Sequence, residues 1–202
     1  EATLRPAVAA AVRPDAVVLS LVKSLHVEPS ANLSLASSQI ASLLGLADDD
    51  RLCVLMGPNL YKQMLDDDGF AEATIGYDDD GSGRGRAGAA LAARALAAPC
   101  FATRSVAGRA AVESCGALKN IVALGVGMCD GAGHGANCQT ALIRAGLGEM
   151  RRFATRFLGV KFAHAHVFTD EACGIGDLLL TCTAGRGRQL AKGFVREGAH
   201  EG

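Results

Sequence analysis

Apolar runs and stretches with helical spacing alternate along the first half of the chain. Residues 16–22 (AVVLSLV) and 52–56 (LCVLM) are apolar almost throughout; Lys23 follows the first run and Gly57-Pro58 the second. Continuous apolar runs of this length are typical of strands buried on both faces of a parallel sheet. Weaker strand signals over residues 74–77 and 101–106 predict two further strands. Helical spacing of the apolar residues predicts two helices, over residues 33–46 and 89–98.

The pattern changes near residue 109, beyond which helical spacing dominates and strand runs are absent. In the clearest segment, residues 140–158, seven apolar or small positions fall on one side of a helix. The other predicted helices cover residues 110–128, 178–182 and 189–196. We therefore predict an α/β protein, with a parallel-sheet domain over residues 1–108 and an all-α domain over residues 109–202.

Composition narrows the class of function. The 202 residues include 20 basic and 21 acidic side chains, and half of the residues are apolar, which is enough for a sizeable core. Balanced charge, 4% aromatic residues and the absence of Trp argue against a nucleic-acid partner. No apolar run approaches the roughly 18 residues of a membrane span, so we expect no membrane partner. Because residue 1 is Glu, we expect the start of the protein to be missing.

Lysine and cysteine are used unevenly. Five lysines stand against fifteen arginines, which draws attention to the lysines because only Lys readily gives up its proton. The seven cysteines form neither a C-x-x-C pair nor a zinc-binding spacing, so we expect no metal site. We interpret the cysteines as small buried apolar side chains in a reducing compartment.

Two stretches match the G-x-G-x-x-G/A pattern of a dinucleotide-binding turn. Residues 83–88 follow three aspartates rather than a buried strand, and we interpret residues 78–88 as a polar loop. Residues 131–136 follow Asp130, a carboxylate badly placed for a pyrophosphate, and resemble a helix end that opens into a glycine-rich turn. Neither stretch is expected to be the nucleotide-binding turn.

The segment over residues 113–137 has the most unusual composition. Lys119 and Asn120 lie in an otherwise apolar helix, where a charged side chain is costly unless it is paired or chemically useful. Gly116 and other small residues leave room for a group to approach the helix closely. The alternative is a surface lysine whose stem lies along a tightly packed helix.

A second set of polar residues occurs over residues 173–188. Asp177 and Thr181 are four residues apart and share a helix face, although helix capping alone would also explain Asp177. Arg186 and Gly187 precede a helix, an arrangement that suits a phosphate group, although an exposed basic turn is the alternative.

Lys23 and Asn59 follow the two strongest strands. In open α/β sheets ligands bind outside the carboxyl ends of the strands, so we expect both side chains at a ligand site.

These segments together resemble the NAD-dependent glycerol-3-phosphate dehydrogenase family. GALKNIVALGVGMCDG resembles its signature helix, CGIGDLLLTCTAGRGR its phosphate-binding segment, and LSLVK and VLMGPN its two strand-end elements. The resemblance implies a partial Rossmann-type domain followed by a helical substrate domain of the 6-phosphogluconate dehydrogenase C-terminal type. It also implies that the chain is an internal fragment, without the N-terminal glycine-rich turn and the C-terminal end.

The family implies NAD as cofactor and reversible hydride transfer between dihydroxyacetone phosphate and sn-glycerol 3-phosphate. The resemblance implies that Lys119 is the general acid and that Lys23 and Asp177 are also catalytic residues. Substrate contacts are implied for Lys23, Asn59, Asn120, Thr181, Arg186 and Gly187, and cofactor contacts for Arg186 and Tyr61. Gly187 stands where the family has Asn, and Tyr61 where it has a small residue.

The resemblance further implies a homodimer in the cytoplasm, with organelle targeting left open by the missing start. Two other functions stay open. One is a related dehydrogenase of another small phosphorylated substrate or hydroxy acid. The other is a non-catalytic fragment that binds or dimerises through its helices.

Overall fold

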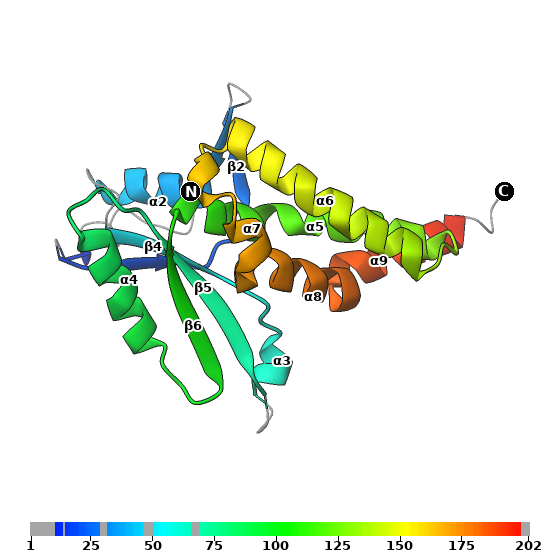
Figure 1. The fold of residues 1–202 in the computed structure, drawn as a ribbon, viewed down its shortest axis with the longest axis horizontal. Helices are drawn as coiled ribbons and strands as arrows, with labels where there is room; N and C mark the ends of the chain where they lie inside the picture. Colours follow the sequence, from blue (N-terminus) through cyan, green and yellow to red (C-terminus); the bar gives the residue numbers. More distant parts are fainter. Residues whose placement is uncertain (1–10, 14, 29–31, 47–50, 66–68, 199–202) are drawn as a thin grey trace.

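A four-stranded sheet and a bundle of long helices form the molecule (Figure 1). The computed structural model describes residues 11–13, 15–28, 32–46, 51–65 and 69–198. The strand order is β1-β4-β5-β6. The bounds are β1 Val18–Ser20, β4 Leu52–Met56, β5 Ala71–Tyr77 and β6 Phe101–Ala107. All four predicted strands are present, but β1 is shorter and β5 longer than the sequence pattern indicated.

The central strand β4 is buried on both faces, as its unbroken apolar run predicts. Successive side chains of a strand point to opposite faces. Cys53 and Leu55 pack with α4, Arg84–Ala95, in one cluster, whereas Val54 and Met56 pack with α5, Arg109–Gly131, in the main cluster. The sheet therefore lies between α4 and α5, and α5 joins it to the helical half.

The expectation of a wholly parallel sheet is wrong at one pairing. β1–β4 and β5–β6 are parallel, but β4 and β5 are antiparallel, with Leu55 opposite Ile75. A parallel pair needs a crossover of a dozen or more residues, usually a helix. Between β4 and β5 the described residues contain only α3, Tyr61–Met64, which is too short to carry the chain back across the sheet.

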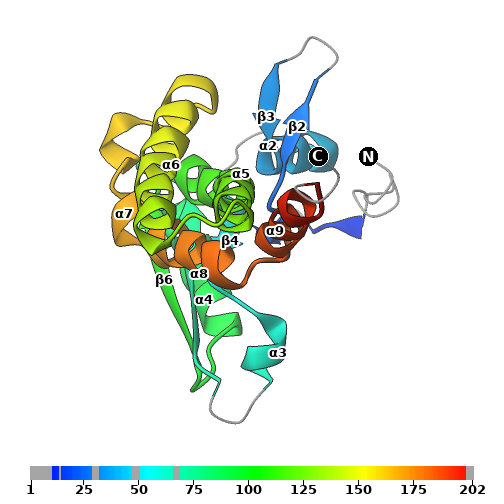
Figure 2. The same ribbon diagram turned by 90° about the vertical axis from the view of Figure 1, so that its right-hand side faces the viewer.

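The segment over residues 33–46 was expected to be one helix, but only its later part is helical. Residues Leu33–Leu35 form β3, which pairs antiparallel with β2, Leu25–Val27, and α2 covers Ala36–Leu44. This hairpin projects from the body in both views (Figures 1 and 2). Leu25 and Leu33 pack against the main core, and this long-range contact favours a strand over the local helical spacing.

The predicted loop over residues 78–88 is also only partly a loop. β5 runs to Tyr77 and α4 begins at Arg84, so a buried strand does precede the first glycine motif, contrary to the sequence interpretation. The connection still carries Asp79, which lies 3.6 Å from Arg86 and so places a carboxylate beside the start of α4.

The second half is helical, as predicted. Beyond α5 the elements are α6 Ala136–Phe157, η2 Phe162–His164, α7 Val167–Asp170, η3 Ala172–Gly176, α8 Asp177–Ala184 and α9 Arg186–Gly198. α5 is long and apolar enough to span a membrane by length and composition, but 61% of its most apolar stretch is buried inside the molecule, as in a core helix.

α9 packs closely on α5 because α5 has glycines where the two helices meet. A methyl group on Gly127 would lie 2.3 Å from the Arg188 carbonyl oxygen, and one on Gly131 2.7 Å from that of Lys192. Asp130 lies between these glycines and pairs with Arg188 at 2.6 Å and Lys192 at 2.9 Å. The second glycine motif is thus a helix end that packs against another helix, and α5 opens into a turn as expected.

Candidate active site

Asp177 is the centre of a buried charged cluster. It is the first residue of α8 and is 1% exposed. Its Oδ1 accepts a hydrogen bond from Lys119 Nζ at 2.5 Å, and its Oδ2 accepts one from Lys23 Nζ at 3.0 Å. Residues far apart in the sequence, from α5, from the loop after β1 and from α8, therefore meet at one carboxylate.

The contacts of Asp177 and Lys119 decide between the alternatives that the sequence left open. The cap residue of α8 is Gly176, and no side chain caps this helix, so capping does not explain Asp177. Lys119 is 8% exposed and ion-paired, so it does not extend along the surface to solvent. Both side chains occupy costly buried positions and compensate each other's charge.

The pKa of Lys119 is lowered, mainly because burial disfavours its charged form. The negative charge and hydrogen bond of Asp177 oppose this shift, and the nearby positive charge of Lys23 adds to it. A buried ammonium with a lowered pKa gives up a proton more readily than a surface lysine does. This property suits a group that transfers a proton near neutral pH.

Two glycines position Lys23. Its Nζ donates to the Gly57 carbonyl oxygen at 3.1 Å, in the turn that follows β4. Gly116 of α5 faces the lysine stem, since a methyl group there would lie 3.2 Å from Lys23 Cγ and 2.5 Å from Met56 Sδ. The expected room beside Gly116 thus accommodates Met56 and Lys23. The carbonyl of Gly57 was not foreseen, because the sequence does not reveal which strand ends adjoin.

Thr74 is a further residue of the site region that the sequence did not single out. Its Oγ1 accepts a hydrogen bond of 3.2 Å from the Cys173 N–H, which joins β5 to η3. η3 is a π-helical turn that leads directly into Asp177, and such turns are frequent at functional sites. Buried Glu171 adds an ion pair of 3.4 Å to Arg104 of β6. The sheet therefore fixes where α8 begins.

Of the remaining predicted residues, Thr181 bonds to this cluster, whereas among the described residues no hydrogen bond or ion pair links Asn120 or Tyr61 to it. Asn59 Oδ1 is buried and has no hydrogen-bond partner among the described residues, so it suits an N–H donor of a bound ligand. Thr181 Oγ1 donates to the Asp177 backbone carbonyl at 2.6 Å and keeps its lone pairs free to accept. Asn120 is exposed on α5, and Tyr61 on α3 is 70% exposed.

The two arginines of the glycine-rich turn differ. Arg188 pairs with Asp130 and is largely buried, so it holds α9 against α5. Arg186, the first residue of α9, is exposed, and within the described ranges no ion pair is formed by it. Gly187 has space for a side chain, because a methyl group there would lie 3.7 Å from Leu124 Cδ2. The helix begins at Arg186, three residues earlier than its spacing predicted.

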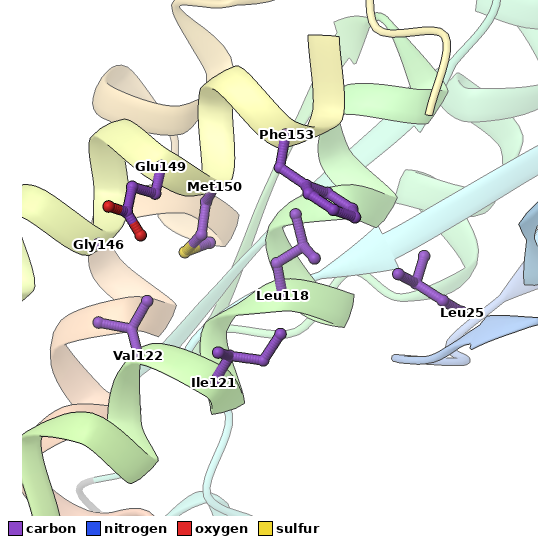
Figure 3. A pocket seen from close by; sticks show the side chains of 8 residues that line it. All are labelled: Leu25, Leu118, Ile121, Val122, Gly146, Glu149, Met150 and Phe153. Carbon is purple, nitrogen blue, oxygen red and sulfur yellow. The ribbon is translucent and has the colours of Figure 1, made fainter. Parts of the chain in front are cut away.

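An apolar hollow of about 200 Å³ lies between α5, α6 and the β2 strand (Figure 3). None of its lining residues belongs to the charged cluster, and Glu149 is its one charged side chain. The lining residues are Leu25, Leu118, Ile121, Val122, Gly146, Glu149, Met150 and Phe153. The hollow lacks the donors that a charged ligand needs, whereas the Asp177 cluster brings three charged side chains together.

The comparisons with known proteins agree on one family. The family model for the NAD-dependent glycerol-3-phosphate dehydrogenase C-terminus matches residues 109–201. The cytoplasmic human NAD⁺ glycerol-3-phosphate dehydrogenase is 38% identical over 93% of this chain and 50% of its own length. The Cuphea lanceolata enzyme is 35% identical over 93% of this chain and 46% of its own.

A solved structure of glycerol-3-phosphate dehydrogenase from Saccharomyces cerevisiae superposes with a TM-score of 0.80 at 28% identity. The match covers 96% of this chain and 54% of the yeast chain. The chain thus spans about half the length of the curated relatives it matches. In sequence and in fold, it belongs to the NAD-dependent glycerol-3-phosphate dehydrogenase family.

Proposed function

We propose that this chain carries the catalytic centre of an NAD-dependent glycerol-3-phosphate dehydrogenase, which interconverts dihydroxyacetone phosphate and sn-glycerol 3-phosphate. The observation that carries the proposal is the pair of lysine ammonium groups bonded to the buried carboxylate of Asp177. Two positive charges and one negative charge leave the cluster with a net positive charge. That balance suits an oxygen atom that becomes negative during reaction.

Lys119 is the proton donor in this proposal. When bound, the nicotinamide cofactor supplies or accepts the hydride at the carbonyl carbon of the substrate. As negative charge develops on the carbonyl oxygen, Lys119 Nζ donates a proton to it and becomes a neutral amine. In the reverse direction the neutral amine accepts the hydroxyl proton. The lowered pKa of Lys119 supports both roles, because burial makes its neutral form accessible.

Lys23 and Asp177 complete the catalytic set. Lys23, fixed by the Gly57 carbonyl and by Asp177, keeps a positive charge beside the developing oxyanion. Asp177 orients both ammonium groups and limits how far the pKa of Lys119 falls. A shared carboxylate of this kind holds two donors in place before the substrate arrives, which is the source of electrostatic preorganisation.

The outer positions are proposed to hold the substrate and the cofactor. The exposed guanidinium of Arg186, at the start of α9, suits a phosphate because guanidinium forks and helix N-termini both bind phosphate oxygens. Asn59, Asn120, Thr181 and Gly187 line the proposed substrate site. Tyr61 and Arg186 contact NAD, and the unpaired Asn59 Oδ1 suits an amide donor.

The organisation of the protein is part of the proposal. The sheet domain covers residues 1–108 and the helical domain residues 109–202; the family match that begins at residue 109 and the left-handed Gly108, with φ of 107°, support this boundary. Cytoplasmic location is supported by the name of the human relative. A homodimer is likewise proposed, as the family resemblance implies.

The function is tested with the protein that carries this chain, by following NADH oxidation with three substrates. Dihydroxyacetone phosphate should exceed dihydroxyacetone in kcat/KM by at least about 100-fold, because the phosphate partners would otherwise stay unpaired. Arg186→Ala should remove most of that preference, whereas Arg196→Ala, farther along α9, should not. Preference for a 2-oxo acid would favour the related dehydrogenase, and no NADH oxidation with any substrate would favour the non-catalytic fragment.

A further inference from the structure

Two cysteine sulfurs meet where α5 turns into α6. Cys129 Sγ and Cys138 Sγ are 3.2 Å apart, although the residues lie in different helices. Cys129 is buried at 7% exposure, and Cys138 is exposed in the first turn of α6. Neither thiol has a part in the proposed function, so their proximity calls for a separate explanation.

The backbone between the two cysteines is held by a series of local hydrogen bonds. The His134 N–H donates to the Cys129 carbonyl oxygen at 3.1 Å, and the Cys138 N–H donates to that of Gly135 at 3.1 Å. Gln139 Nε2 also donates to the His134 carbonyl oxygen at 3.1 Å. Gly133, with φ of 81°, lets the chain reverse. The turn therefore presents the two sulfurs to each other.

We propose that Cys129 and Cys138 form a reactive thiol pair, which a small-molecule disulfide such as oxidised glutathione converts reversibly into an intrachain disulfide. A disulfide needs its sulfurs about 2.05 Å apart, so the observed separation closes by roughly 1 Å through side-chain rotation. Nothing in the turn has to unfold for this bond to form.

The thiol–disulfide exchange with oxidised glutathione proceeds in two steps. The Cys138 thiolate attacks one sulfur of oxidised glutathione, whose S–S bond breaks to release one glutathione thiolate and leave a mixed disulfide on Cys138. The Cys129 thiolate then attacks Cys138 Sγ, which releases the second glutathione. Two protein thiols are oxidised, one glutathione disulfide is reduced to two thiols, and the two protons from the cysteines pass to glutathione.

The entry point is Cys138 rather than Cys129. Cys138 is exposed, whereas the pKa of Cys129 is raised, first by its hydrogen bond to Cys138 and further by desolvation and nearby negative charge. Of the other cysteines, Cys53, Cys115, Cys173 and Cys182 are buried and Cys100 is exposed. Cys100 therefore serves as a matched exposed thiol that lies outside the pair.

The pair is tested by equilibrating the protein in buffers of graded reduced and oxidised glutathione, quenching with acid, alkylating under denaturing conditions and mapping the peptides. We expect two of the seven thiols to be lost together, with one linked peptide that joins Cys129 to Cys138. Cys138→Ser should abolish the link, and Cys100→Ser should leave its midpoint unchanged.

The oxidised protein should also melt about 5 °C higher than the reduced protein, because the bond restricts the unfolded chain. Cys138→Ser should show no such difference between the two conditions. Three outcomes overturn the proposal: full alkylation of both cysteines at every glutathione ratio, a stable mixed disulfide on Cys138, or a link that joins different cysteines.

Discussion

Asp177→Asn removes the charge at the centre of the cluster while it keeps the size and shape of the side chain. Lys119 and Lys23 are then left with an amide oxygen in place of a carboxylate; their side chains are 10% and 31% exposed. Removing one partner of a buried ion pair costs about 3–5 kcal/mol, because the other charge stays desolvated without compensation. Since Lys23 still reaches solvent and Gly57, we expect the lower end, about 3 kcal/mol.

The destabilisation should depend on pH in a defined direction. The pKa of Lys119 is already lowered from 10.5, and loss of the Asp177 charge lowers it further. Between the folded pKa and the unfolded value, the unfolded chain holds more protons, so stability rises with pH. In the variant this interval begins at a lower pH. The difference in unfolding free energy between wild type and Asp177→Asn should therefore shrink as pH rises from about 7 to about 9.

Urea denaturation followed by circular dichroism at the two pH values measures both effects. Asp170→Asn is the matched control, since Asp170 is exposed and its contact with Thr169 survives as an amide hydrogen bond. The reasoning is refuted if Asp177→Asn costs less than about 1 kcal/mol at neutral pH, or if its effect grows as pH rises.

Three further substitutions, two of them paired with a comparison variant, test the packing and the phosphate site. Gly116→Ala should destabilise the protein by about 1–3 kcal/mol in urea denaturation because its methyl group would lie 2.5 Å from a methionine sulfur. Gly125→Ala on the same helix meets nothing within 4 Å and should stabilise it; equal effects would contradict this. Thr74→Val leaves a buried N–H of η3 unpaired and should cost about 1–3 kcal/mol, and Thr74→Ser should retain most of the stability. Gly187→Asn introduces the residue that the family resemblance implies at this position, where space allows a side chain, and should lower KM for dihydroxyacetone phosphate; an unchanged KM would count against a substrate contact at position 187.

The sequence predicted the elements of this fold better than their connections. The continuous apolar run identified β4, because burial on both faces leaves such a signal. The other three strands of the sheet were identified by the run over residues 16–22 and by the weaker signals over residues 74–77 and 101–106. The direction of β5 was missed, since an antiparallel pairing depends on the short connection through α3 and not on the composition of the strand. The β2–β3 hairpin was missed because Leu33 has helical spacing locally but packs against the distant core.

The same holds for the candidate site, where the sequence indicated individual residues but not their contacts. Lys119 stands out in the sequence because a charged residue in an apolar helix is costly, and Asp177 because it shares a helix face with Thr181. Their bond across 58 positions, and the contribution of the Gly57 carbonyl, depend on tertiary packing. A backbone oxygen has no sequence signal, and neither has the threonine that anchors η3 from a neighbouring strand.

The proton-transfer role of Lys119 is tested most directly by Lys119→Ala, in the protein that carries this chain. Turnover of dihydroxyacetone phosphate and the dissociation constant of NADH are measured side by side, with Lys119→Arg as a variant that keeps the charge but does not release a proton readily. We predict that both variants lose about 10²–10⁴-fold in kcat, while NADH binding stays nearly unchanged. Turnover by Lys119→Ala within about tenfold of wild type would contradict the assignment of Lys119 as the general acid.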